Sequence, residues 1–414
     1  MIYAAYQAYQ DATAPARFWA GATLSYLKRF DPEGRFWPAL PLAAWLDLVE
    51  GMTLSHEHPR WGIDSVEIRG REVPIAREAV AETPFGSLLH FRKPIDMGQP
   101  KVLLVAPISG HFATLLRPTI AQLLPEHDVY VTDWANARDV PAHAGRFGLD
   151  EHIDHLLQFL RATGPGTHLF AVCQPCPSAI AATAILAQDG DEAVPASLVL
   201  MAGPVDARAN PTSVSEFAVN HSLDWFERTM ISPVPLGEPG YRRRVYPGFL
   251  QIGAFMSMNL ERHLSAHREV YRALSRGESE RAQPIQTFYD EYYAVSDLTA
   301  ELFLETVDRV FQRRLLAKGE FAWRGRRVDP AAVTNVPLMT IEGERDDICS
   351  PGQTAAAHGL LVNVPESMKL AHVQAGAGHY GVFSGSKWRN GIYPKLREFI
   401  AKADRGQGAQ RKAA

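Results

Sequence analysis

Three residues that lie far apart in the chain are of the types that together carry out nucleophilic acyl chemistry. Cys173 lies in the segment AVCQP, Asp346 in GERDDI and His379 in GAGHYG. A histidine can take the proton of a cysteine thiol, and a carboxylate can orient the imidazole and stabilise its charged form. Cys173 is therefore a candidate nucleophile, Asp346 a candidate acid and His379 a candidate base.

The surroundings of Cys173 predict a sharp turn from a strand into a helix. An apolar run over 167–174 contains the cysteine near its end, and a segment of helical composition follows over 177–188. Such a turn exposes the nucleophile above a sheet, and the start of the helix favours a thiolate. The usual motif is G-x-S-x-G, whereas Ala171 and Pro175 stand in place of the glycines here. A buried structural cysteine at a strand end is the alternative.

Asp346 and His379 each follow a predicted strand in the last fifth of the chain. The order nucleophile, acid, histidine accompanies such a turn in hydrolytic enzymes, and all three residues come just after strand ends. Glycines on both sides of His379 would let the backbone carry it over the sheet edge. Asp347 is the second candidate acid. Taken singly, the acid could be a solvated turn residue and the histidine a loop residue.

A backbone site for a negatively charged oxygen is predicted beside Cys173. It needs the N–H of the residue after the nucleophile, Gln174, and a second N–H from the loop after the first core strand. In that loop either Ile108 or Ser109 could supply the second N–H. His111 follows in the same loop, where it could bind substrate or be a surface histidine.

The other two cysteines indicate no second chemistry. Cys176 lies one helical turn after Cys173, and C-x-x-C is the spacing of a redox pair or of half a zinc site. The sequence contains no second such pair, and the preceding strand is not the first of a thioredoxin unit. We therefore expect neither a metal nor a cofactor, and we interpret Cys349 as structural.

The elements that must position these residues form a parallel sheet. Continuous apolar runs without polar alternation are typical of parallel strands covered on both faces. Helical patterns lie between them, which predicts a doubly wound, mostly parallel α/β fold of the α/β-hydrolase type. A short strand pair is expected around 65–75 and another strand at 87–92. The core runs are 101–107, 127–134, 167–174, 196–204 and 336–347.

The pattern divides the chain into five expected parts. Aromatic residues at helical spacing near the N-terminus predict a helical extension. A long aromatic segment of helical pattern interrupts the strand–helix alternation, and we interpret it as an inserted cap or lid whose Arg242–Arg244 cluster is solvated. The parts are the N-terminal extension (1–64), the first part of the hydrolase core (65–205), the cap (206–334), the second part of the core (335–402) and a disordered tail (403–414).

Composition excludes several classes of protein. The 414 residues carry 42 Lys and Arg against 46 Asp and Glu, a net charge of −4, which argues against a nucleic-acid partner. The longest apolar segment, Phe249–Met258, is too short to span a membrane. Three cysteines are too few for a disulfide framework, and the start lacks a signal-peptide pattern. A soluble cytoplasmic protein is expected.

Segments spread over almost the whole chain resemble the intracellular polyhydroxyalkanoate depolymerases of bacteria, of the poly(3-hydroxybutyrate) type. The resemblance implies an α/β-hydrolase with a cysteine nucleophile that releases 3-hydroxybutyrate or short oligomers from amorphous storage polyester. By residue match it assigns Cys173 as nucleophile, Asp346 as acid and His379 as base. The resembling segments are AVCQP (171–175), GPVDARANPT (203–212), FYDEYYAVSDLTAELFLETV (288–307), GERDDICSPGQT (343–354) and GAGHYGVFSG (376–385).

The resemblance also sets the expected partners. These are the polymer and the surface of storage granules in the cytoplasm; a homodimer is compatible with it, and no cofactor is implied. Polyhydroxyalkanoate synthases share the Cys, Asp and His but typically keep G-x-C-x-G, so Ala171 and Pro175 favour degradation. A synthase-like acyltransferase and a non-catalytic granule-binding protein on a hydrolase scaffold are the alternatives.

Aromatic residues of the cap could bind the polymer or form the acyl pocket. We single out Trp225, Phe249 and Phe255 of the insertion as candidates for this contact. Packing within the cap is the alternative explanation for most such residues.

Overall fold

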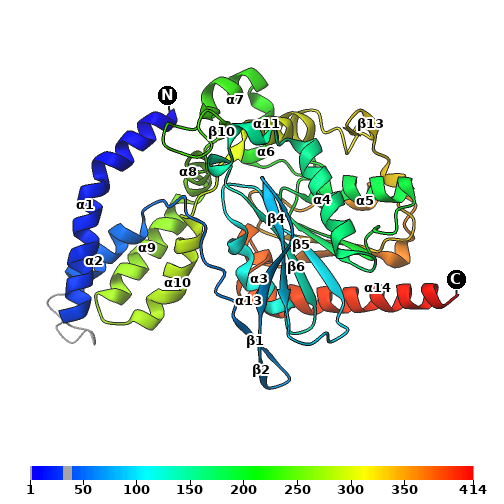
Figure 1. The fold of residues 1–414 in the computed structure, drawn as a ribbon, viewed down its shortest axis with the longest axis horizontal. Coiled ribbons are helices and arrows are strands. Elements are labelled where there is room, and N and C mark those ends of the chain that lie inside the picture. The colour runs from blue at the N-terminus through cyan, green and yellow to red at the C-terminus, as the bar shows by residue number, and fades with distance from the viewer. Residues whose placement is uncertain (1, 31–39, 414) are drawn as a thin grey trace.

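An eight-stranded sheet lies at the centre of the molecule (Figure 1). The computed structural model describes residues 2–30 and 40–413, and the side chains as far as 406. The strand order is β15-β14-β8-β7-β5-β6-β4-β3. Strand β4 runs opposite in direction to the other seven strands of this sheet. The strands are β3 (Ala76–Thr83), β4 (Gly86–Arg92), β5 (Lys101–Val105), β6 (Asp128–Trp134), β7 (His168–Val172), β8 (Ser197–Met201), β14 (Leu338–Gly343) and β15 (Lys369–Gln374).

Helices cover both faces of the sheet, as the apolar strands require. Every residue of β7, β8 and β14 is buried, which is the burial expected of a parallel strand covered on both sides. The predicted α/β-hydrolase fold is confirmed, and the five predicted core runs each contain a strand of the sheet. The covering helices are α3 (Arg117–Leu123) and α14 (Tyr393–Ala413) on one face, with α4 (Leu149–Thr163) and α5 (Cys176–Asp189) on the other.

The chain between β8 and β14 leaves the sheet and is mostly helical, as predicted. It also holds two small sheets that no periodicity could reveal, because their strands are only two or three residues long. The helices are α6 (Ser213–Asn220), α7 (Leu223–Met230), α8 (Gly248–Met258), α9 (Leu260–Leu274), α10 (Ser279–Tyr292), α11 (Ala300–Glu305) and the π-helix η5 (Thr306–Gln312); the strands are β9 (Ser232–Pro233), β10 (Arg244–Tyr246), β11 (Leu298–Thr299), β12 (Ala322–Trp323) and β13 (Arg326–Arg327).

Four helices project from one side of the sheet as a helical arm (Figure 1). Two are α1 (Ile2–Phe30) and α2 (Leu40–Gly51) from the N-terminus, and the other two are α9 and α10. Residues 1 and 31–39, part of the predicted N-terminal extension, lie outside the described residues. The arm therefore joins segments that are more than 200 residues apart in the sequence.

Tyr3 fastens the start of the arm to the rest of the molecule. Its hydroxyl donates a hydrogen bond of 2.7 Å to Asp297 Oδ2 and accepts one of 3.1 Å from Arg138. Asp297 Oδ1 accepts the backbone N–H of Gly248 at 2.8 Å. Burial raises the pKa of Asp297 to about 6 despite these donors. Tyr3 thus anchors α1 both to the cap, through Asp297, and to the segment that follows β6, through Arg138.

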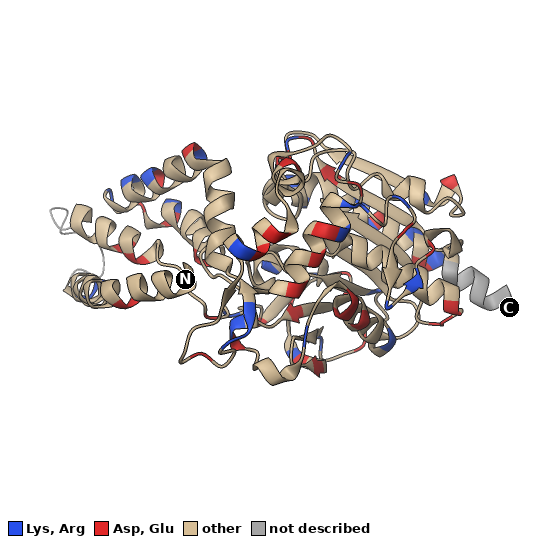
Figure 2. Cartoon of the chain, turned by 90° about the horizontal axis from the view of Figure 1, so that it is seen from above, with Lys and Arg blue, Asp and Glu red and all other residues tan. Residues whose placement is uncertain are grey.

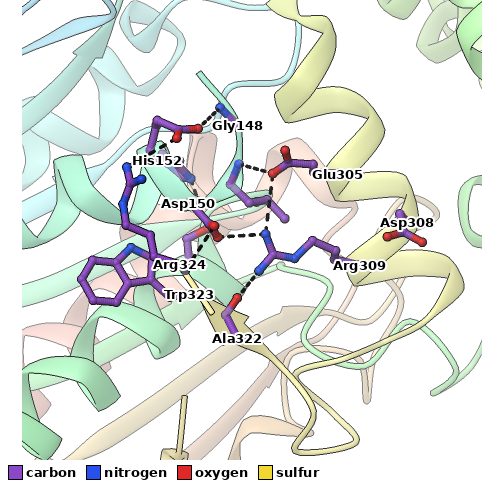
Figure 3. A network of polar contacts seen from close by, with 12 residues as sticks. Gly148, Asp150, His152, Glu305, Asp308, Arg309, Ala322, Trp323 and Arg324 are labelled. Atoms are coloured by element: carbon purple, nitrogen blue, oxygen red, sulfur yellow. Dashed lines mark hydrogen bonds and ion pairs between the residues drawn. The ribbon is translucent and has the colours of Figure 1, made fainter. Parts of the chain in front are cut away.

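A polar network fastens the other end of the cap to the start of α4 (Figure 3). Arg309 on η5 donates to Asp150 Oδ1 at 2.9 Å, and Glu305 Oε2 accepts the backbone N–H of Leu149 at 2.9 Å. Arg324 pairs with Asp154, one turn further along α4. Acidic side chains are favourable at a helix start. The carboxylates of Asp150 and Glu305 therefore both stabilise the start of α4 and join it to the cap.

Several local predictions differ from the structure. Strand β3 is absent from the predictions because its edge position leaves most of its side chains exposed. Helix α14 continues to Ala413, where a disordered tail (403–414) is predicted; residue 414 lies outside the described residues. Arg243 is buried, because its guanidinium donates to the carbonyls of three residues, Val140, Pro141 and Gly145.

Among the helices of the described residues, none combines the length and the hydropathy that a membrane span requires.

The remaining predicted strand pair is β1 (Ser65–Ile68) with β2 (Arg71–Pro74), which forms a separate antiparallel hairpin as expected.

Candidate active site

Cys173 lies at the turn between β7 and α5, and its backbone adopts a strained conformation. Its φ angle is 66°, in the left-handed region that residues other than glycine rarely occupy. The turn is held by two backbone hydrogen bonds, from the Cys173 N–H to Met201 O at 2.7 Å and from the Cys176 N–H to Cys173 O at 3.1 Å. Strain of this kind is maintained where the surrounding structure enforces it and is frequent at functional sites.

Gly203 makes room for the turn, and the sequence analysis did not single it out. A Cβ atom on Gly203 would lie 2.5 Å from Cys173 O and 2.3 Å from Cys176 Sγ. Thr354 holds Gly203 from the other side, because its hydroxyl accepts the Gly203 N–H at 2.8 Å and donates to Gly203 O at 3.0 Å. The signal available in the sequence was a glycine near the end of the predicted core run 196–204.

Replacing Gly203 by alanine is expected to distort the turn at Cys173. The added methyl group collides with a backbone carbonyl, so the turn must shift or the protein must unfold, and overpacking of this kind typically costs about 1–3 kcal/mol. We expect a lower melting temperature and a more than tenfold loss of esterase activity. The matched control is Gly359→Ala on a surface helix, where a Cβ meets no atom within 4 Å. Equal stability and activity of the two variants would contradict this description of the turn.

Asp346 is buried, and its carboxylate is aimed by the backbone. Oδ1 accepts the N–H of Ile348 at 3.0 Å and that of Cys349 at 2.8 Å, while Oδ2 lies 2.8 Å from His379 Nδ1. Asp347 is exposed and pairs instead with Asn259 of the cap. The two adjacent acids therefore face different partners, and only Asp346 contacts the histidine.

Asp346 sits in a loop that Glu342 organises. The buried carboxylate of Glu342, near the end of β14, accepts the backbone N–H groups of Gly352, Thr354 and Ala355 at 2.8–3.0 Å. The same turn carries the Thr354 hydroxyl that holds Gly203. One buried carboxylate thus links the loop of the acid to the turn of the cysteine.

His379 lies between Asp346 and Cys173, just after β15. Burial disfavours the charged imidazole, but the attraction of Asp346 and of the Cys173 sulfur outweighs it and raises the pKa of His379 well above its usual value. Its Nδ1 faces Asp346, which leaves the other ring nitrogen for the cysteine side. The structure thus brings together all three residues that the sequence placed after strand ends.

The loop after β5 approaches the turn from the opposite side. The Ile108 N–H donates a long hydrogen bond of 3.4 Å to the side-chain oxygen of Gln174. Ile108 is thus oriented toward the residue after the cysteine. Among the described residues, the Ser109 N–H donates no hydrogen bond to a side chain of another element. Gly110, with φ 84°, turns the loop toward the cap, where its carbonyl accepts the Ser296 N–H at 2.9 Å.

His111 is buried in an aromatic wall, which we define as the rings of His111, Phe255, Tyr292 and Tyr380. The ring centroid of His111 lies 5.0 Å from that of Tyr292 and 6.3 Å from those of Phe255 and Tyr380. Burial lowers the pKa of His111 to about 4, so the ring is neutral at pH 7. Its Nε2 is buried without a hydrogen-bond partner among the described residues.

Tyr380 directly follows His379, and its ring contacts both this candidate base and the other rings of the aromatic wall. Its ring contacts those of His379 and Tyr292 at 5.7 Å each. Burial and the neighbouring Tyr292 hydroxyl raise its pKa well above the usual value, with a further contribution from Cys173. The sequence analysis missed Tyr380, although its position next to the candidate base was a usable signal.

Two of the three aromatic cap residues singled out from the sequence do not belong to the aromatic wall. Phe249 stacks on Tyr6 of α1 with a centroid distance of 4.0 Å, which places it at the base of the helical arm. Trp225 packs within the cap, against His221 at 4.1 Å and against Phe217. Phe255 alone belongs to the aromatic wall.

The remaining cysteines are buried, and burial raises the pKa of both thiols. Cys176 directs its thiol toward the carbonyls of Ala171 and Met201, so it contributes to packing at the helix start. In the part of the chain that the structure describes, no group of three or more His, Cys, Asp or Glu side chains is arranged to hold a metal ion.

Comparison with known proteins gives one match to a family model and several similar solved structures. Residues 202–404 match the family model described as PHB de-polymerase C-terminus. None of the curated proteins compared matches the chain. Similar solved structures include the α/β hydrolase GrgF from Penicillium sp. sh18 (14% identity, 80% of this chain and 99% of that one, TM-score 0.45) and a thermophilic esterase from Thermogutta terrifontis (16% identity, 82% and 97%, TM-score 0.40). Another is a monoacylglycerol lipase from Paleococcus ferrophilus (14% identity, 80% and 100%, TM-score 0.43).

Proposed function

Because residues 202–404 belong to the PHB depolymerase C-terminal family, we propose that this ester hydrolase cleaves amorphous poly(3-hydroxybutyrate) through Cys173. The observation that carries the proposal is the contact of 2.8 Å between Asp346 Oδ2 and His379 Nδ1 beside the strained cysteine. The family match supports the proposed class of substrate, and this contact supports the assignment of the residues that act on it.

In the proposed reaction His379 takes the proton of the Cys173 thiol. The raised pKa of His379 favours this thiolate–imidazolium pair. The thiolate attacks the ester carbonyl, and the tetrahedral intermediate collapses when His379 gives its proton to the departing alkoxide. A thioester on Cys173 remains. Water, deprotonated by His379, then attacks the thioester, and the acid is released with the thiol regenerated.

The negative oxygen of the intermediate needs donors at the turn. In the proposal these are the backbone N–H groups of Gln174 and Ile108, with Ser109 as the other candidate in the loop. The Ile108 N–H is engaged by the Gln174 side chain at 3.4 Å, a long and therefore weak bond. A substrate oxygen can replace it at low cost, so the Gln174 side chain serves as a placeholder for the oxyanion.

The aromatic wall suits the acyl part of a neutral polyester. Its rings are apolar, and the lowered pKa of His111 keeps the imidazole uncharged at neutral pH. The partnerless Nε2 of His111 could then bond a polar atom of the substrate, which agrees with the substrate-binding role expected for it. Phe255 remains a candidate for contact with the methyl branches of the polymer. Trp225 and Phe249 are not proposed as acyl-pocket residues, because they lie away from the wall.

Product analysis on amorphous poly(3-hydroxybutyrate) particles tests the proposed function. We expect the protein to release soluble 3-hydroxybutyrate or short oligomers in buffer alone, because water is the acyl acceptor. Incubation with 3-hydroxybutyryl-coenzyme A should yield no polymer. Polymer formation from the thioester would indicate a synthase-like acyltransferase. Binding to particles without any release would indicate a non-catalytic granule-binding protein, and either result would overturn the proposal.

A further inference from the structure

We propose that the groove between α1 and α2 of the helical arm binds the polyester chains at a particle surface and so docks the protein on its insoluble substrate. The inference rests on the proposed function and adds a second binding site, whose lining does not include Cys173. The groove has a volume of about 910 Å³, within the usual range for ligand-binding clefts. We call it the arm groove; it is lined by α1, α2, residues 53–54 and Phe249.

Large aromatic side chains are exposed along this groove. Tyr9 is 63% exposed, Trp19 68% and Trp45 54%, and all three line it. Two more aromatic residues, Phe18 at 70% and Tyr26 at 67%, are exposed on the same helix. Scattered single exposed hydrophobic residues are normal, but a contiguous apolar patch of aromatic side chains marks an interaction surface.

The charge of the groove fits a neutral partner. Among the described residues that line it there is no Asp or Glu, and Arg17 is the one charged residue. The Arg17 guanidinium is already directed to the Thr13 hydroxyl and to Gln10 O at 2.8 Å. In Figure 2 the helix that leaves the N label is almost entirely tan. A surface built for anionic lipid would instead carry several Lys or Arg residues beside the apolar face.

The polar side chains of the groove can all donate hydrogen bonds, which suits an ester. A polyester presents carbonyl and ester oxygens, which only accept, along a chain without internal donors. Trp19 and Trp45 offer indole N–H groups, and Tyr9, Gln10 and Thr23 offer hydroxyl or amide donors. Aromatic surface combined with donors and without carboxylates is therefore complementary to this polymer.

The groove also leads toward the candidate active site. Phe249, which lines the groove, lies on the first turn of α8, and Phe255 lies on the same helix six residues later. Six residues correspond to about 9 Å along a helix. Phe255 belongs to the aromatic wall beside His379. One short helix thus connects the docking groove with the wall that receives the acyl group.

The test compares two triple variants of the full chain. The arm variant carries Tyr9→Gln, Trp19→Gln and Trp45→Gln. The control variant carries Ile95→Gln, Leu236→Gln and Val362→Gln, which replace residues that are 73%, 82% and 60% exposed outside the arm. Each set is made with and without Cys173→Ala, so that binding to amorphous poly(3-hydroxybutyrate) particles is measured by sedimentation without hydrolysis. Circular dichroism verifies folding, and a soluble 3-hydroxybutyrate ester reports the chemistry.

We expect the arm variant to bind particles at least tenfold more weakly than the control variant, with kcat/KM on the soluble ester unchanged. Equal particle binding of the two variants would overturn the inference. So would a dimer that becomes a monomer only in the arm variant, because the groove would then hold a second copy. Binding of the wild type to phosphatidylcholine–phosphatidylglycerol vesicles as tightly as to particles would overturn it too. Failure of the proposed function is distinct, since it would appear as an inactive wild type on the soluble ester.

Discussion

Replacing Cys173 by alanine is expected to lower ester hydrolysis by about four orders of magnitude or more, while the protein remains folded. Without the thiol no acyl-enzyme can form, and only the donors at the turn and the binding of the substrate remain to promote attack by water. The side chain is half-buried, and alanine tolerates the φ of 66° about as poorly as cysteine does, so stability should change little. The measurement is kcat/KM on a soluble 3-hydroxybutyrate ester, with a thermal melt of each variant.

Cys176→Ala is the matched control for this prediction. Cys176 lies three residues later at the start of α5, is fully buried, and directs its thiol to backbone carbonyls rather than to His379. Its loss should lower the melting temperature slightly and leave kcat/KM within a few-fold of the wild type. If Cys173→Ala retained activity while Cys176→Ala lost it, the assignment of the nucleophile would be wrong.

The second large effect is expected from Asp346→Asn. The amide keeps the shape of the side chain but removes the negative charge that orients and stabilises the imidazolium, and a comparable change in a serine triad costs about 10⁴ in rate. Asp347→Asn is the matched control, because Asp347 is exposed and pairs with Asn259. We expect a loss of about 10³–10⁴-fold for the first variant and less than about threefold for the second. Equal losses would contradict the choice of acid.

The pH profile of Asp346→Asn carries a further expectation. Although burial lowers the pKa of His379, Asp346 and Cys173 together raise it, so the imidazolium persists to high pH in the wild type. Removing the Asp346 charge lowers that pKa, so the imidazolium is lost at lower pH. The alkaline limb of kcat/KM should therefore move toward lower pH in this variant. An unchanged alkaline limb would show that His379 does not depend on Asp346.

Much of the central sheet could be predicted because burial leaves a direct mark on the sequence. A strand covered on both faces must be apolar throughout, and β5, β7, β8 and β14 all lie within runs of that kind. Strand β3 could not be found in this way, because the sheet edge leaves it exposed and its sequence is polar. The two-residue strands of the cap depend on pairing partners far along the chain, which no local pattern encodes.

The three candidate residues could be predicted because each follows a strand in an order typical of the fold. The residues that hold these three in place could not be predicted, because their roles arise from contacts between distant segments of the chain. Gly203 matters because α5 passes within van der Waals distance of it, and Glu342 because a loop ten residues later folds back onto its carboxylate. The positions of Phe249 and Trp225 were equally hidden, because aromatic composition does not reveal which partner a ring packs against.

The measurement that tests the central claim most directly is the identification of the acylated residue. The wild type is mixed with a soluble 3-hydroxybutyrate ester, quenched in acid within the first turnovers, digested, and analysed by mass spectrometry. Acid preserves a thioester, so we predict a 3-hydroxybutyryl group on the peptide that contains Cys173, which is absent from the Cys173→Ala digest. A 3-hydroxybutyryl group on another residue, with Cys173 unmodified and hydrolysis intact in Cys173→Ala, would contradict the account.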